Sequence, residues 1–166
     1  MPPLLELSSS LGQALQARGW QLALAESCTG GLIAQSMTAV AGSSAWFDRG
    51  FVTYSNAAKT DMLGVPAVLI DEHGAVSEAV AQAMAIGALE HSLATISGAV
   101  TGIAGPGGGS AYKPVGMVCF AWATRQPGLP HVLVHTRYFT GDRQQVREQA
   151  ASYLLAVLLR SVTSEV

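Results

Sequence analysis

Charge is scarce in this chain: Asp, Glu, Lys and Arg make up 12% of its 166 residues, against 49% hydrophobic residues. The eleven acidic and nine basic residues are scattered and give a formal net charge of −2. Proteins that bind nucleic acid present a basic stripe, so this composition argues against a nucleic-acid partner. The low charge also indicates either a large core or a surface covered by a second copy, and we expect a homo-oligomer.

Long hydrophobic runs are missing as well. Runs such as Leu154–Leu159 are far shorter than the ~20 residues that a membrane-spanning helix needs, so we expect no membrane partner. The first residues carry Glu6 and no basic residue, which is not the pattern of a secretory signal. The two cysteines, Cys28 and Cys119, form no CxxC pair, and we expect reduced thiols in a cytoplasmic protein.

Histidine is also rare, and its four copies form no metal-binding motif. His131 and His135 share one face of a predicted strand, but no HExxH pattern or Cys/His cluster surrounds them. We therefore expect neither a metal nor a cofactor. A Ser-His-Asp triad stays open as an alternative, although no GxSxG elbow supports it.

The spacing of apolar residues predicts helices and strands that alternate early, followed by a strand hairpin. Predicted helices begin near Leu4, Thr29, Asn56, Ser77 and Asp142, and predicted strands begin near Trp20, Gly50, Thr95, Val115 and His131. This order predicts a three-layer α/β/α sandwich with a mixed, mainly parallel sheet. The length suits one domain, which we expect to span residues 1–166.

Three polar loops follow predicted elements, and open α/β sheets bind ligands where their strands end. The first loop is "AESCTGG", in which Ser27, Thr29, Gly30 and Gly31 precede a helix and resemble an anion site. The alternative is an ordinary helix cap at Thr29 with tight packing. Cys28 in the same loop is a rival nucleophile, or else a small buried apolar residue.

The second loop region, "GSSAWFDRGFVTYSNAAK", runs from Gly42 to Lys59. A serine needs a base to act as a nucleophile, and a lysine made neutral by burial, or a tyrosine beside a lysine, can serve in place of histidine. Ser44, Tyr54 and Lys59 are candidates for such a set. The structural alternative is that Ser43 caps a turn, Tyr54 packs and Lys59 is solvated.

The third loop, "TGIAGPGGGSAYKP", is dense in glycine, including Gly105 and Gly107. It lacks the Lys-Ser/Thr ending of a P-loop and does not fit GxGxxG. Its glycines allow close backbone approach to a ligand, or they make a plain flexible loop. "SAYK" (residues 110–113) matches SxxK, but that motif requires a helix, so we treat the match as chance.

Taken in order, the motifs resemble the CinA C-terminal domain family. The matching segments are "AESCTGG", "GSSAWFDRGFVTYSNAAK", "GAVS", "TGIAGPGGG", "KPVG" and "GDRQQVR", and they cover nearly the whole chain from about Leu5 to Leu159. One such motif is weak evidence, whereas six in order are specific. The resemblance implies an amidohydrolase that converts nicotinamide mononucleotide to nicotinate mononucleotide and ammonia, in pyridine nucleotide recycling.

The resemblance also implies roles for particular residues. It makes Ser44 the nucleophile, with Tyr54 and Lys59 assisting and Thr101 also catalytic. It also implicates an arginine that maps less directly, to Arg143. The sequence leaves open whether Arg143 or Arg147 binds the substrate phosphate, and whether Lys59 or Tyr54 is the base. Two other readings remain, a nucleotide-binding module without turnover and an accessory to DNA uptake.

Overall fold

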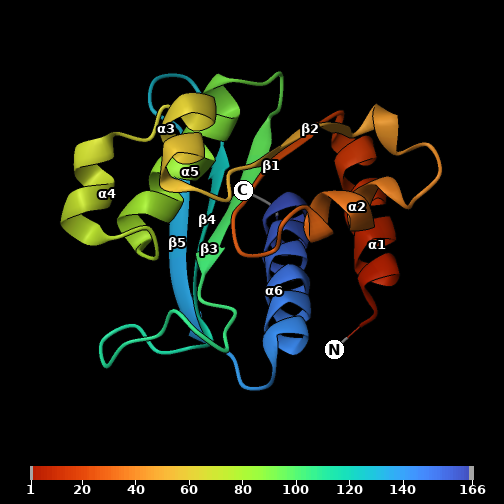
Figure 1. The fold of residues 1–166 in the computed structure, drawn as a ribbon. Helices are drawn as coiled ribbons and strands as arrows, with labels where there is room; N and C mark the ends of the chain where they lie inside the picture. Colours follow the sequence, from red (N-terminus) through yellow and green to blue (C-terminus); the bar gives the residue numbers. More distant parts are fainter. Residues whose placement is uncertain (1, 165–166) are drawn as a thin grey trace.

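A five-stranded sheet runs through the middle of the molecule, with helices on both of its faces (Figure 1). The computed structural model describes residues 2–164. The strands are β1 (Leu22–Glu26), β2 (Phe47–Val52), β3 (Ile96–Gly102), β4 (Met117–Thr124) and β5 (His131–Tyr138). The helices are α1 (Leu4–Arg18), α2 (Leu32–Thr38), α3 (Asn56–Leu63), α4 (Ala67–His73), α5 (Glu78–Glu90) and α6 (Arg143–Thr163), with a short 3-10 helix, η1 (Ser43–Ala45).

The sheet is mixed, with the strand order β2-β1-β3-β4-β5. β1 pairs in parallel with β2 and β3, whereas β4 pairs antiparallel with β3 and β5. The predicted three-layer sandwich with a mixed sheet is confirmed. The parallel pairs lie among the first three strands, and the late hairpin contributes the antiparallel ones.

One helical layer consists of α1, α2 and α6. Leucines at one-turn spacing on α1, including Leu11 and Leu15, are fully buried against α6 and the sheet. Gly19 ends α1 in the left-handed conformation, with φ 67°, that glycine adopts without strain. Asp142 begins α6 with a capping box. Its side chain accepts from the Gln145 N–H, and the Gln145 side chain accepts from the Asp142 N–H.

The other helical layer consists of α3, α4 and α5. Ser77 caps α5, whose buried face includes Met84 and packs against β1, β3 and β4. α5 also lies close against α3 at Gly87, where a Cβ atom would collide with the carbonyl oxygen of Leu63. This close contact fixes the position of α3, and therefore of Lys59, relative to the sheet.

Because β1, β2 and β3 run in parallel, their carboxyl ends meet at one edge of the sheet. Ser27 directly follows β1, Tyr54 follows β2 by two residues, and the glycine-rich loop follows β3. The antiparallel return of β5 brings the start of α6, with Arg143, to the same edge. Sequence segments far apart in the chain therefore converge there.

Candidate active site

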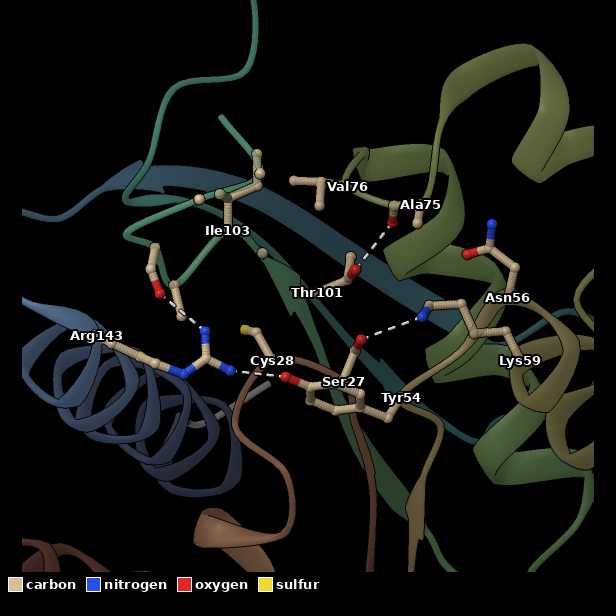
Figure 2. A pocket seen from close by; sticks show the side chains of 15 residues that line it. Ser27, Cys28, Tyr54, Asn56, Lys59, Ala75, Val76, Thr101, Ile103 and Arg143 are labelled. Carbon is tan, nitrogen blue, oxygen red and sulfur yellow. Dashed lines mark hydrogen bonds between the residues drawn. The ribbon is translucent and has the colours of Figure 1, made fainter. Parts of the chain in front are cut away.

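A cavity of about 270 Å³ lies at this edge of the sheet (Figure 2). Its lining comes from the ends of all three parallel strands, from α3, from the loop before α5, and from the first residue of α6. The lining residues are Ser27, Cys28, Tyr54, Asn56, Lys59, Ala75, Val76, Gly102, Ile103, Ala104, Gly105, Gly107, Gly108, Thr101 and Arg143. Among them Lys59 and Arg143 are basic and none is acidic, so the described lining favours an electron-rich ligand.

Lys59 and Ser27 form the chemically most unusual pair of the cavity. The Lys59 side chain is almost fully buried, with 1% of its surface exposed. Its Nζ donates hydrogen bonds to Ser27 Oγ at 3.1 Å and to the Thr53 carbonyl oxygen at 3.0 Å. Burial lowers the pKa of Lys59 below its usual 10.5, an effect that the nearby Cys28 partly opposes.

The local sequence explains how this lysine comes to be buried. Ser55 caps α3 by accepting from the Ala58 N–H at 3.0 Å, so the helix starts directly after β2. Lys59 then lies in the first turn of α3, on the face that packs toward the end of β1. A buried amine beside a serine hydroxyl is the arrangement of a serine nucleophile with a lysine base.

The thiol of Cys28 lies next to Ser27 but is poorly suited to attack. Burial raises the pKa of the Cys28 thiol to about 12, so it is protonated at neutral pH. A protonated, buried thiol is a weak nucleophile. The geometry therefore favours Ser27 over its neighbour.

Tyr54 and Arg143 close one side of the cavity. Arg143 donates from Nη2 to the Tyr54 hydroxyl at 2.7 Å and from Nη1 to the Gly105 carbonyl at 2.9 Å. Figure 2 shows the Arg143 guanidinium beside the Tyr54 hydroxyl, with their hydrogen bond dashed. Tyr54 is 60% exposed, so this pair forms a rim and does not belong to the buried floor where Lys59 lies.

Thr101 is buried, and its hydroxyl donates to the Ala75 carbonyl at 2.9 Å. This bond joins the end of β3 to the loop before α5, and Ala75 and Val76 thereby form one wall of the cavity. The Thr101 hydrogen is used in this bond, so the hydroxyl has acceptor capacity left toward the cavity.

Ser44 is not brought to this site, which corrects its grouping with Tyr54 and Lys59. It lies exposed in η1, before β2, whereas Tyr54 and Lys59 follow β2. The five residue steps of β2 separate its ends by roughly 16 Å at about 3.3 Å per step. Ser44 therefore lies near the opposite end of β2 from Lys59.

The predicted anion site at Thr29, Gly30 and Gly31 is also corrected. Glu26, 1% exposed, turns its carboxylate into the start of α2 and accepts from the N–H groups of Ile33 and Ala34, both at 2.9 Å. Thr29 does not cap the helix and instead donates its hydroxyl hydrogen to Glu26 at 2.7 Å. A carboxylate of the chain itself therefore occupies the place of an external anion.

The two arginines named for phosphate binding are separated by the structure. Arg147 donates to the carbonyl oxygens of Cys28 at 3.2 Å and Thr29 at 3.0 Å, so it supports the loop after β1. Arg143 lines the cavity. Of the predicted site residues, the structure thus brings together Ser27, Tyr54, Lys59, Thr101, Gly105, Gly107 and Arg143. Asn56 was missed, although it lies in the "YSNAAK" segment between two of them.

Within residues 2–164, no three His, Cys, Asp or Glu side chains gather in a way that would hold a metal ion. The same residues include no helix long and apolar enough to cross a membrane.

Comparison with known proteins gives consistent matches over almost the entire chain. The model of the CinA C-terminal domain matches residues 4–162. The nicotinamide-nucleotide amidohydrolase PncC of Enterobacter agglomerans is 54% identical over 155 residues, which is 93% of either chain. A putative competence-damage inducible protein of Symbiobacterium thermophilum is 53% identical over 93% of this chain, which corresponds to 37% of that longer protein.

A solved structure agrees with these sequence matches. The competence/damage inducible protein of Agrobacterium tumefaciens superposes with a TM-score of 0.92 at 46% identity, covering 99% of this chain and 98% of that one. The match by sequence, by fold and by family model leads to one conclusion: the chain belongs to the CinA C-terminal domain family.

Proposed function

We propose that this protein hydrolyses the carboxamide of nicotinamide mononucleotide, giving nicotinate mononucleotide and ammonia. The observation that carries the proposal is the hydrogen bond from buried Lys59 to Ser27 in the cavity. The 54% identity to a protein named nicotinamide-nucleotide amidohydrolase supports this choice of substrate. The reaction belongs to the recycling of pyridine nucleotides.

In the first half of the reaction, Ser27 attacks the carboxamide carbon. Neutral Lys59 takes the hydroxyl proton across the 3.1 Å contact, and the lysine becomes an ammonium beside the oxyanion that forms. Lys59 then returns this proton to the amide nitrogen, the C–N bond breaks, and ammonia leaves. An ester between Ser27 and the nicotinoyl group remains.

In the second half, water attacks the ester carbon and Lys59 accepts the water proton. The tetrahedral intermediate collapses, the proton passes to Ser27 Oγ, and the carboxylic acid is released. Thr101 holds the wall formed by Ala75, and its hydrogen bond to the Ala75 carbonyl supports a positioning role. Every proton that enters or leaves is carried by groups on the described lining, so the mechanism needs neither metal nor cofactor.

Arg143 is the group that best suits the phosphate of the nucleotide. It lies at the rim, its guanidinium matches two phosphate oxygens, and the glycines at 105 and 107 allow the ligand to approach the backbone. Binding of a phosphate there would replace the bond from Arg143 to the Tyr54 hydroxyl. The Tyr54 hydroxyl only accepts in its bond with Arg143, so its own hydrogen is available to the substrate whether or not that bond is kept.

The test is an assay of ammonia release with three amides: nicotinamide mononucleotide, the riboside without phosphate, and free nicotinamide. We expect turnover of the mononucleotide that survives EDTA, and at least tenfold lower kcat/KM for the two that lack phosphate. Tight nucleotide binding without ammonia release would instead identify a binding module. Salt-dependent DNA binding would favour the accessory to DNA uptake.

We also propose that the protein is a cytoplasmic homo-oligomer. Both cysteines are free thiols, as is usual in a reducing compartment. The edge strand β5 exposes Leu133, Val134 and Tyr138, which supports a shared face. Light scattering at micromolar concentration tests this proposal, and a monomer would refute it.

A further inference from the structure

The proposed nucleophile, Ser27, lies in a tight turn that joins β1 to α2. Its N–H donates to the Val100 carbonyl at 3.0 Å, and its carbonyl accepts from the Gly30 N–H at 3.0 Å. Gly30 has φ 59°, a left-handed conformation that glycine adopts without strain. The position of the Ser27 hydroxyl therefore depends on the backbone of residues 27–30.

Arg147, on α6, holds the middle of this turn from outside the cavity. Its Nε donates to the Cys28 carbonyl at 3.2 Å, and its Nη2 donates to the Thr29 carbonyl at 3.0 Å. Within residues 2–164, Arg147 is the only donor to the Cys28 carbonyl. Arg147 is partly buried and does not line the cavity, so it is not placed to contact the substrate.

Lys59 is held by a different part of the chain. It belongs to α3, and its Nζ also donates to the Thr53 carbonyl at 3.0 Å. The 3.1 Å contact between Lys59 Nζ and Ser27 Oγ thus joins two separately anchored segments. A shift of the turn by about 1 Å would break this contact without moving the lysine, and a displacement of that size costs about 10²-fold in rate.

The bonds from Arg147 are of a kind that resists such a shift. A guanidinium donates through a rigid, planar fork, and hydrogen bonds from a charged donor are stronger than neutral ones. Loss of Arg147 leaves the carbonyl of buried Cys28 without a donor. Because an unpaired buried carbonyl is costly, we expect this peptide to turn toward water and to displace Ser27.

We infer that Arg147 is a positioning residue for the nucleophile, which keeps Ser27 Oγ within hydrogen-bond distance of Lys59 Nζ and contacts no substrate. This inference rests on the proposed function through the role of Ser27. It also separates two arginines that lie one helical turn apart on α6. Arg143 lines the cavity and suits the phosphate, whereas Arg147 serves the chemical step.

The first experiment measures kcat and KM for ammonia release from nicotinamide mononucleotide by Arg147→Ala and Arg147→Lys. Arg147→Ala should lower kcat about 10²-fold and leave KM within about threefold. Arg147→Lys keeps the charge but not the fork, so its kcat should lie between those of Arg147→Ala and the wild type. Guanidinium ion at a millimolar, non-denaturing concentration should raise kcat of Arg147→Ala about fivefold or more, because it supplies the missing fork.

The second measurement does not depend on the substrate. A fluorophosphonate forms a bond between its phosphorus and Ser27 Oγ, fluoride leaves, and Lys59 takes the hydroxyl proton. Mass spectrometry follows the rate of this labelling and identifies the labelled residue. We expect Arg147→Ala to react about tenfold more slowly than the wild type, and guanidinium ion to restore part of the rate.

Arg160→Ala is the matched control. It removes an arginine near the other end of α6, on an exposed side chain that does not line the cavity. It should change kcat, KM and the labelling rate by no more than about twofold, and guanidinium ion should not raise them. Thermal unfolding followed by circular dichroism checks that the variants fold. If Arg147→Ala does not fold, Arg147→Lys decides, with a lower kcat expected at an unchanged KM.

The inference is overturned if Arg147→Ala keeps near-normal kcat, or if its KM rises as much as its kcat falls, since Arg147 would then act on the substrate. It is also overturned if guanidinium ion restores neither kcat nor the labelling rate. A wild type that is labelled at Ser27 but releases no ammonia refutes the proposed function, and the labelling rates then decide the inference. A wild type that releases ammonia, beside an Arg147→Ala variant labelled at the wild-type rate, refutes the inference alone.

Discussion

Replacement of Lys59 by methionine removes the amine but keeps a long, unbranched side chain in the same buried space. In the structure, Lys59 Nζ is the only group that makes a hydrogen bond to Ser27 Oγ within residues 2–164. Ser27 in the variant would therefore have to lose its proton to water. A general base is typically worth 10²–10⁴ in rate, which corresponds to about 2.7–5.4 kcal/mol of transition-state stabilisation.

We expect kcat to fall by this factor while KM stays within about threefold, because Lys59 contacts Ser27 and the Thr53 carbonyl and not the rim at Arg143. Lys59→Arg should fail as severely, since a guanidinium keeps the charge but does not deprotonate near neutral pH. Steady-state ammonia release measures both variants. Near-normal kcat in Lys59→Arg would show that the lysine is only an electrostatic support.

The pH profile gives a second readout of the same prediction. The base must be neutral to accept a proton, so activity rises as pH rises through the pKa of Lys59. Burial lowers that pKa, and the rising limb should therefore lie below 10.5. The residual activity of Lys59→Met should lack this limb. An identical limb in the variant would assign it to another group and contradict the role of Lys59.

The remaining predictions concern the frame around the site. Glu26→Ala leaves two N–H groups of α2 without their acceptor, so it should lower the free energy of unfolding by about 2 kcal/mol or more. Glu26→Gln should lower it less, and urea denaturation measures both variants. Equal losses in the two variants would contradict the capping role. Cys28→Ala should keep most of the activity, because a pKa of about 12 leaves the Cys28 thiol protonated. Complete loss of ammonia release in this variant would instead indicate that the thiol is the nucleophile. Gly87→Ala should destabilise the fold by roughly 1–3 kcal/mol, because the new methyl group collides with the Leu63 carbonyl and pushes α3 away from α5. An unchanged melting temperature for this variant would show that the two helices have room to separate.

Local signals in the sequence were sufficient for most of the elements. Ser77 and Asp142 mark helix starts by side-chain chemistry that depends on a few adjacent residues, and both predictions are confirmed. α4 was not predicted, since it is short and follows directly after Pro66. The order of helices and strands along the chain also predicted the three-layer arrangement.

The site could be predicted only in part, because its central contact joins residues far apart in the chain. Ser27 and Lys59 are 32 positions apart and meet because β1 and β2 pair in parallel with ends aligned, from Leu22 beside Phe47 to Glu26 beside Val52. Nothing in the local pattern specifies that register. The sequence instead suggested Ser44, which is nearer to Lys59 along the chain but separated from it by the length of β2.

The start of α2 shows a second limit of local reasoning. "AESCTGG" has the hydroxyl and glycine pattern of an anion site, and Glu26 is part of the motif. Whether that carboxylate points to solvent or back into the helix depends on tertiary packing. In the structure the Glu26 carboxylate points back and accepts from the Thr29 hydroxyl and from N–H groups at the start of α2. The predicted anion site is therefore occupied by a side chain of the protein itself.

The most direct test of the account compares ammonia release from nicotinamide mononucleotide by Ser27→Ala and Ser44→Ala. Both variants lose one serine hydroxyl, and Ser44→Ala is the matched control near the far end of β2. The account predicts that Ser27→Ala loses about 10⁴-fold or more in kcat, as for the loss of a nucleophile, while Ser44→Ala stays within about threefold of the wild type. An inactive Ser44→Ala beside an active Ser27→Ala would contradict it.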